Sequence, residues 1–167
     1  AEKISKDLAM SGVCVVSGLA RGIDTAAHIG ALKGGGKTLA VIGSGLSCIY
    51  PNENRPLAEE IAASGAVISE YPMKTPPAKG LFPQRNRIVS ALGSGVCLIE
   101  SPIQGGAMIT MDLAESQSKP LFALPGRVDW PSFEGNHALL KKQKAKLIEN
   151  SSDLLEYFNL TQSPSFG

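Results

Sequence analysis

Two glycines and an arginine directly follow an apolar run, a combination typical of anion-binding loops. The run ends at Ser17, and Gly18, Arg21 and Gly22 come after it. Glycine lets backbone N–H groups approach a ligand, and a guanidinium can donate two parallel hydrogen bonds to a phosphate. We expect this loop to bind an anion, with Asp24 capping the next helix or orienting the guanidinium. The alternative is a surface ion pair between Arg21 and Asp24, which would contribute little.

Two more glycine-containing loops follow later apolar runs. Gly43, Ser44 and Gly45 come after one run, and Gly105 and Gly106 open a helical pattern after another. The first loop lacks the third glycine of a dinucleotide fingerprint, and a Tyr-Pro pair delays its helix, which argues against NAD. Bare N–H groups still favour a phosphate in both loops. An ordinary tight turn is the alternative for the first loop.

Cations and an aromatic residue gather where another helix is predicted to begin. Arg85 and Arg87 lie in its first turns, where positive charge opposes the helix dipole unless a partner supplies negative charge. Lys79 and Phe82 lie just before them, a spacing that suits one phosphate and one stacked base. The alternatives are core packing for Phe82, and a capping role for Asn86 or an ion pair with an acid that would account for one arginine.

Other chemistries find no support in the sequence. The cysteines are three in number and far apart, and neither His28 nor His137 has a partner at metal-ligand spacing, so we expect no metal, no disulfide and a reduced, cytoplasmic protein. No catalytic motif of the common hydrolase or metalloprotease types is present, and we expect no enzyme activity and no cofactor. The formal net charge is only +1, so any contact with nucleic acid must come from a local basic patch. No apolar run is long enough to span a membrane, and we expect no signal peptide.

Short apolar runs alternate with helical patterns, which predicts an α/β fold with a mostly parallel sheet and helices on both faces. The predicted strands are 13–17, 38–42, 66–69, 96–100, 120–124 and 145–148. The predicted helices are 2–10, 23–33, 54–64, 83–92, 107–118, 136–144 and 151–159, with Asn54 and Ser151 as N-caps. Long loops at 71–82 and 125–135 follow strands, so we expect both at the ligand-binding carboxyl edge of the sheet. One domain should cover residues 1–159, followed by a polar tail at 160–167. No strand precedes the first helix, so we expect the sheet to lack its first strand.

Five motifs in this order resemble the DNA processing protein A (DprA/Smf) family. They are SGLARGID at 17–24, GSGLSCIYPNEN at 43–54, FPQRNRIVSAL at 82–92, GGAMIT at 105–110 and FALPG at 122–126. The resemblance implies an extended Rossmann-like fold that binds single-stranded DNA, protects incoming DNA in natural transformation and helps to load the RecA recombinase. The family's opening strand with its glycine loop is absent here. Gly105 replaces a common serine, and the turn at 143–145 is one residue longer than usual.

The resemblance also implies which residues contact DNA and how the chain associates. It places Arg21 in the DNA pocket with the backbone of the glycines beside it, and the loop at 43–45 in the pocket wall. Lys79 and Phe82 would touch phosphate and base, with Arg85 and Arg87 beneath them. The family tends to form dimers through this domain, and the apolar pair Leu139 and Leu140 is the candidate surface.

Two other functions remain as alternatives. An enzyme of the nucleotide phosphoribohydrolase type has a related fold, but Leu113 stands where its catalytic acid would be needed. A nucleotide-sensing module without a role in DNA binding is the second alternative.

Overall fold

The strands form two parallel sheets whose carboxyl ends face the same edge of the molecule. The structure, a computed structural model, describes residues 1–160, so most of the expected tail lies outside the described residues. One sheet has the order β1 (Val15–Ser17), β2 (Thr38–Val41), β3 (Ala66–Ile68). The other has the order β4 (Val96–Leu98), β5 (Leu121–Ala123), β6 (Lys146–Leu147). Each strand falls within its predicted range, which confirms the α/β prediction.

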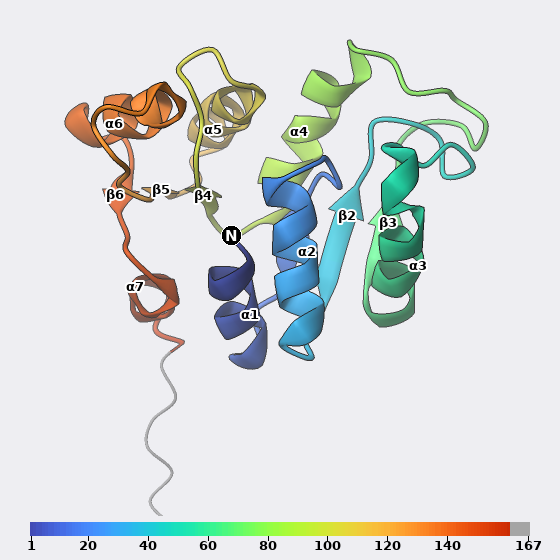
Figure 1. Cartoon of the computed structure of the whole chain (residues 1–167), viewed down its shortest axis with the longest axis horizontal. Helices are drawn as coiled ribbons and strands as arrows, with labels where there is room; N and C mark the ends of the chain where they lie inside the picture. The colour runs from blue at the N-terminus through green and yellow to red at the C-terminus, as the bar shows by residue number, and fades with distance from the viewer. Residues whose placement is uncertain (161–167) are drawn as a thin grey trace, which may run out of the picture.

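The helices also fall close to their predicted ranges and cover both sheets (Figure 1). They are α1 (Glu2–Met10), α2 (Ile23–Lys33), α3 (Arg55–Ser64), α4 (Leu81–Leu92), α5 (Gly106–Ser116), α6 (Glu134–Lys141) and α7 (Ser151–Tyr157). Short 3₁₀ turns precede two of them, η1 (Asn52–Asn54) before α3 and η2 (Pro131–Phe133) before α6. The helix at the chain start packs along α2, because Gly30 and Gly34 let the two backbones approach; a Cβ at Gly30 would lie 2.2 Å from the Glu2 carbonyl oxygen.

Each sheet has its own apolar core. In the first, Leu19, Ala40, Ile42, Ala58 and Ile61 pack together. In the second, Leu98, Met111, Ala114, Leu121, Ala123, Leu139 and Ala145 do so, and Phe122, Ile148 and Leu154 form a smaller cluster beneath α7. Leu139 is therefore a core residue, and Leu140 packs against the same core. This corrects the expectation that the Leu139–Leu140 pair forms a dimer surface.

The α7 helix is capped by Asn150 and not by Ser151, the residue that we had predicted as its N-cap. The Asn150 side chain accepts a hydrogen bond from the Ser152 N–H at 2.8 Å, and the Asp153 carboxylate accepts one from the Asn150 N–H at 3.2 Å. The Ser151 hydroxyl donates instead to the Asp7 carboxylate at 3.1 Å, which ties α7 to α1.

A groove of about 1090 Å³ separates β1 from β4. Residues of both strands line it, together with apolar side chains of α1 and α7. Neither β1 nor β4 has a second strand partner in the part of the chain that the structure describes. Within the described residues, no strand pairing joins the two sheets across this groove.

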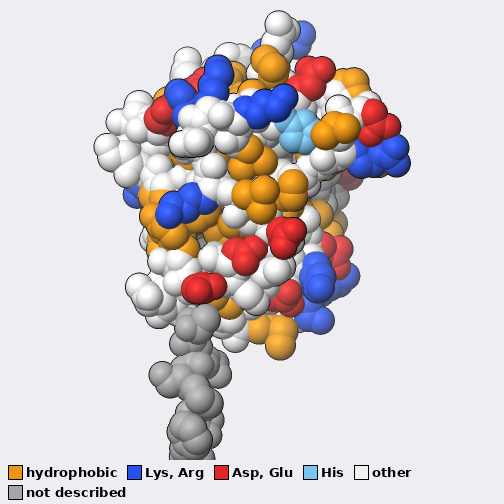
Figure 2. All heavy atoms as spheres, turned by 90° about the vertical axis from the view of Figure 1, so that its left-hand side faces the viewer, with side chains coloured by type: hydrophobic (Ala, Val, Ile, Leu, Met, Phe, Trp, Pro, Cys, Tyr) orange, Lys and Arg blue, Asp and Glu red, His pale blue; other side chains and the backbone are white. Residues whose placement is uncertain are grey.

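The opposite border of the second sheet is the short strand β6, which is exposed. Leu147 keeps 55% of its surface accessible, and Tyr157 of the neighbouring α7 keeps 40%. Figure 2 faces this side of the molecule and shows hydrophobic side chains in its middle, with charged side chains above and below them.

Candidate nucleic-acid interface

Asp24 bonds to the loop after β1 and does not contact Arg21 through a hydrogen bond. The Asp24 carboxylate accepts hydrogen bonds from the Ser17 hydroxyl at 2.7 Å and from the Ala20 N–H at 3.1 Å. Gly22, the residue before α2, has φ +82°, a conformation that favours glycine. The alternative of an Arg21–Asp24 ion pair is therefore wrong, and so is the expected orientation of Arg21 by Asp24.

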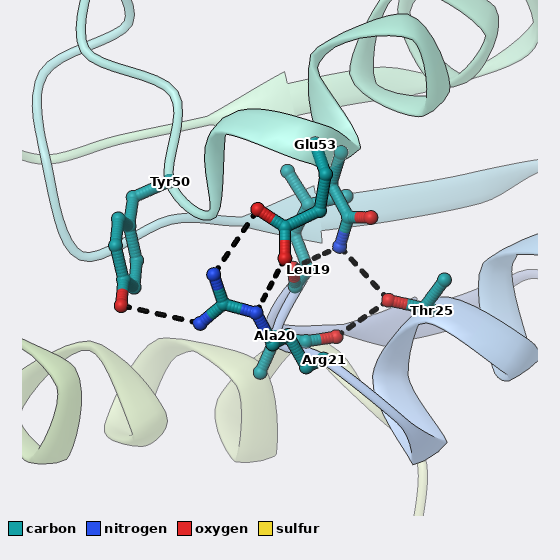
Figure 3. Close-up of polar contacts among 7 residues, drawn as sticks. Leu19, Ala20, Arg21, Thr25, Tyr50 and Glu53 are labelled. Atoms are coloured by element: carbon teal, nitrogen blue, oxygen red, sulfur yellow. Dashed lines mark hydrogen bonds and ion pairs between the residues drawn. The ribbon is translucent and has the colours of Figure 1, made fainter.

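Arg21 is held by two residues that the sequence analysis did not select (Figure 3). Its Nε and NH2 groups donate to the two carboxylate oxygens of Glu53, and its NH1 group donates to the Tyr50 hydroxyl at 3.3 Å. The guanidinium also lies 5.5 Å from the centre of the Tyr50 ring. The hydrogen bonds that Arg21 donates to Glu53 and Tyr50 raise the pKa of Arg21, and Arg21 in turn lowers the pKa of Glu53. An anion that binds the Nε and NH2 groups of Arg21 has to displace the Glu53 carboxylate.

The Arg21–Glu53 pair is reachable from solvent. The two side chains keep 61% and 54% of their surface exposed. An ion pair this exposed contributes little to stability, so its exchange for another anion has a low cost. The arginine is thus fixed in place and still available to a ligand.

Asn54 fixes the relative position of these two residues. Its buried amide donates to the Leu19 carbonyl at 2.9 Å and to the Thr25 hydroxyl at 2.8 Å, and the Thr25 hydroxyl donates to the Ala20 carbonyl at 2.7 Å (Figure 3). These bonds join η1 to the loop after β1. Asn54 is the N-cap residue of α3, as predicted, but its side chain makes no capping hydrogen bond, because its amide is used across the fold.

The loop after β2 is packed against a neighbouring segment instead of being open to a ligand. The Gly45 N–H donates to the Thr75 carbonyl, and the Ser47 N–H donates to the Met73 carbonyl, both at 2.9 Å. The Ser44 hydroxyl donates to the Cys48 carbonyl at 2.7 Å. The Gly45 and Ser47 N–H groups and the Ser44 hydroxyl are thus already used within the protein. The loop has the character of a wall.

Gly43 brings this wall into contact with Phe82. A Cβ at Gly43 would lie 2.9 Å from the Phe82 ring, so a larger residue would displace that ring. Phe82 is half-buried in the first turn of α4, and the centres of the Phe82 and Tyr50 rings are 5.7 Å apart. Arg21, Tyr50 and Phe82 thus form one continuous surface of two rings and a guanidinium, which we name the aromatic–arginine cluster. Lys79 is exposed just before α4.

Neither Arg85 nor Arg87 has a free guanidinium. Arg85 is only 5% exposed and donates to the Gly18 carbonyl at 2.5 Å and to the Val41 carbonyl. Burial lowers the pKa of Arg85, and its charge lies beneath the loop that carries Arg21. Arg87 is exposed and pairs with Glu70, the acid partner that we had considered as an alternative. Asn86 accepts from the Arg85 Nε at 3.1 Å, so it does not cap the helix.

Two glycines lie at the start of α5, and one of them, Gly106, borders the same groove. Gly105 precedes the helix, where a Cβ would lie 2.2 Å from the Ser101 hydroxyl oxygen, and Gly106 has open space around it. Gly106 lines the groove together with Arg21, Tyr50 and Phe82. The loops after β1, β2 and β4 and the start of α4 therefore meet at one edge, at the top of Figure 1.

Asn136 is a further polar residue that sequence reasoning missed. It is fully buried in α6, and its side-chain oxygen accepts from the Ser101 N–H at 3.0 Å. Its amide donates to the carbonyls of Leu98, Ile99 and Leu124 at 3.0 to 3.1 Å. These bonds hold the loops after β4 and β5 together. No local sequence pattern predicts this role, because all four partners are distant in the sequence.

The described residues offer neither a metal-binding cluster nor a membrane-spanning helix. Across residues 1–160, no group of three or more His, Cys, Asp or Glu side chains is arranged to hold a metal ion. None of the helices in the same range is long and apolar enough to cross a bilayer.

Curated relatives share much of this sequence. Protein Smf of Escherichia coli is 43% identical over 150 residues, which are 89% of this chain and 40% of that protein. DNA processing protein DprA of Streptococcus pneumoniae is 43% identical over 144 residues, which are 86% of this chain and 51% of that protein. The chain thus spans about half or less of the length of these two relatives.

Solved structures of DNA processing protein A share the fold. The X-ray structure of the Streptococcus pneumoniae protein matches with a TM-score of 0.84 and 39% identity, over 93% of this chain and 54% of that one. A Helicobacter pylori structure, described in terms of that protein's single-stranded DNA binding mode, matches with a TM-score of 0.86 and 34% identity, over 95% of this chain and 71% of that one. The family model for DNA recombination-mediator protein A matches residues 1–159. This chain therefore belongs to the DNA recombination-mediator protein A family.

Proposed function

We propose that this chain binds single-stranded DNA at the carboxyl edge of its sheets and catalyses no reaction there. The observation that carries the proposal is the aromatic–arginine cluster, which combines a phosphate-binding group with rings on which bases can stack. The single-stranded DNA binding mode described for the Helicobacter pylori relative supports it. Contacts of this kind read no sequence, because every nucleotide has a phosphate and a stacking face.

The roles that we propose for the predicted site residues differ. Arg21 and Lys79 contact phosphates, and Phe82 stacks on a base. Gly106, at the start of a helix of 11 residues, offers backbone N–H groups to a further phosphate. The remaining site residues shape and support this surface: Ser17, Gly18, Gly22, Gly43, Ser44, Gly45, Arg85, Arg87 and Gly105.

Binding can be tested by fluorescence anisotropy with oligo-dT and with a duplex of equal length. We expect salt-sensitive binding of the single strand and much weaker binding of the duplex. Arg21→Ala should weaken single-strand binding by about tenfold or more, since a charge-assisted contact is lost, while the melting temperature stays nearly unchanged. Normal binding by this variant, or its unfolding, would contradict the assignment.

Lys79→Ala and Phe82→Ala should weaken binding in different ways. Loss of Lys79 should flatten the slope of log K against log salt by about 0.7, because one fewer counterion is released from the strand. Loss of the Phe82 ring should cost roughly 1–3 kcal/mol of binding and leave that slope unchanged. An abasic oligonucleotide is the control, because it lacks the base that the ring contacts, so Phe82→Ala should add little penalty on it.

We further propose that the whole protein protects incoming DNA in the cytoplasm and helps to load the RecA recombinase onto it. The family description as a recombination mediator supports this role. Its test is RecA filament formation on oligo-dT coated with a single-strand-binding protein. The expected result is faster filament formation with this protein, lost in Arg21→Ala.

We also propose that two copies associate through the exposed border at β6. Leu147 on this border keeps 55% of its surface accessible. Sedimentation should give a dimer that Leu147→Asp dissociates. Met10→Asp, at a residue 64% exposed on α1, is the control and should leave the dimer intact. A monomer at high concentration would refute this part.

A further inference from the structure

The loop after β5, residues 124–130, exposes an aromatic side chain that the site described above does not include. Trp130 is the only tryptophan of the chain and keeps 48% of its surface exposed. The Arg127 guanidinium lies over it, 5.3 Å from the ring centre. Val128 between them is 92% exposed. An indole that remains this accessible gains free energy when a ligand covers it.

Trp130 is exposed because a neighbouring ring already fills the inner position. Phe133 packs over Gly126, where a Cβ would lie 2.1 Å from its ring, and it stacks on His137 with ring centres 6.4 Å apart. The Trp130 ring lies outside Phe133, at 6.3 Å between centres. The loop fold therefore does not depend on burial of the indole.

Backbone and side-chain bonds fix the indole and its arginine in place. The Trp130 N–H donates to the Arg127 carbonyl at 3.2 Å, and the Phe133 N–H donates to the Trp130 carbonyl at 3.0 Å. The Arg127 guanidinium donates to the two Asp129 carboxylate oxygens at 3.0 and 2.7 Å, which holds its plane beside the ring. A ligand that covers this surface meets groups that are already ordered, which lowers the entropy cost of binding.

This surface lies at the same edge of the molecule as the aromatic–arginine cluster. The Gly135 N–H donates to the Ser101 carbonyl at 2.9 Å, and Asn136 bonds to both the Ser101 N–H and the Leu124 carbonyl. The loop with Trp130 is thus joined to the segment that leads to Gly106, which borders the groove beside Phe82. Both loops rise at the upper edge in Figure 1.

We propose that Trp130 and Arg127 form a second stacking site for single-stranded DNA, which takes a base and its phosphate several nucleotides away from the base on Phe82. This inference rests on the proposed function. A ring with an arginine beside it suits this ligand, because bases stack on both indole and guanidinium planes and the guanidinium also attracts the phosphate. The two sites would bind one strand together, so the second should add affinity only to strands long enough to reach it.

The single tryptophan permits a direct test in the whole protein. Oligo-dT is titrated while binding is followed by anisotropy and the Trp130 contact by intrinsic fluorescence. We expect long oligo-dT to quench the tryptophan emission in parallel with binding, and an abasic strand of equal length to quench it far less. Trp130→Ala should weaken binding of long oligo-dT by about fivefold or more and leave binding of a very short strand unchanged.

Two variants serve as controls for this test. Trp130→Phe keeps a stacking ring and should retain most of the affinity, and Val128→Ala removes an exposed neighbour and should bind normally. Anisotropy that reports binding while the tryptophan emission stays constant, together with normal binding by Trp130→Ala, would overturn the second site alone. Absence of binding by the wild-type chain would overturn the proposed function and this inference with it. A tryptophan that responds to RecA and not to DNA would replace the stacking site with a protein-docking surface.

Discussion

The Glu53 carboxylate that pairs with Arg21 leads to a prediction about the affinity of this site for DNA. Glu53 occupies the Nε and NH2 groups of Arg21, the same edge that a phosphate would use for two parallel hydrogen bonds. Glu53 therefore competes with a DNA phosphate for the Arg21 guanidinium. We expect Glu53→Gln to bind oligo-dT more tightly than the wild-type chain, because the glutamine amide has no charge to hold the guanidinium or to repel a phosphate.

The size of this effect follows from the exposure of the pair. Both side chains are more than half exposed, so the affinity should rise by about twofold to fivefold, the range typical of the coupling within exposed ion pairs. The variant also gains one net positive charge at the phosphate position, so the slope of log K against log salt should steepen by about 0.7. The melting temperature should change little, because the exposed Arg21–Glu53 pair contributes little to stability, while the buried Asn54 amide also joins η1 to the loop after β1.

The assay is a pair of salt titrations by anisotropy, with Glu60→Gln as the matched control. Glu60 is exposed on α3, and its substitution changes the net charge of the chain by the same amount. Equal behaviour of the two variants would mean that only net charge matters. Weaker binding by Glu53→Gln, with an unchanged melting temperature, would refute the reasoning and assign Glu53 the role of holding Arg21 in position for the phosphate.

Three further predictions concern the scaffold. His28 is buried, and burial lowers its pKa from 6.5 to about 4, so the folded state favours the neutral ring. About 3 kcal/mol of stability should therefore be present above pH 6.5 and be lost as the pH falls to about 4. Thermal melts should show a smaller loss of stability over this pH range in His28→Gln. Asn136→Ala should lower the free energy of unfolding by about 2–4 kcal/mol and the melting temperature by roughly 4–16 °C. The reason is that it leaves the buried Ser101 N–H without its acceptor and three carbonyls without their donor. A smaller shift in calorimetry would show that water replaces the amide. Gly45→Ala should destabilise the chain, because its Cβ would lie 2.1 Å from the Pro72 carbonyl oxygen, whereas Gly106→Ala should not, and similar melting temperatures for the two would count against this packing.

Elements whose pattern is local could be predicted well from the sequence. The strands around Ala40 and Leu98 are short runs of apolar residues covered on both faces, and such runs leave few alternatives to a parallel sheet. The helix from Ile23 to Lys33 has the predicted bounds, because glycines flank it at both ends. The candidate loops were found for the same reason, since glycines after apolar runs mark the carboxyl edge.

Polar contacts between distant residues could not be predicted in this way. Glu53 is 32 residues from Arg21, and the Asn54 amide reaches back 35 residues to the Leu19 carbonyl. Arg85 was expected near DNA because positive charge in the first turns of a helix opposes the helix dipole unless a negative partner is present, yet carbonyls at the ends of β1 and β2 accept its hydrogen bonds. The partner of a polar side chain depends on which loops the topology brings together, and local periodicity does not contain that information.

The two strand borders that face the groove have a consequence for how this chain behaves in solution. Within the described residues, β1 pairs only with β2 and β4 only with β5, so each presents a row of backbone N–H and C=O groups along one side. Such a border can accept any extended segment of suitable polarity, including one from a second copy of the chain. Association of this kind would be made by the main chain at the groove, apart from the dimer proposed at β6, so it should depend little on which side chains the strands carry. Val16→Pro, within β1, should weaken it, because proline removes a backbone donor and fits poorly beside a pairing strand.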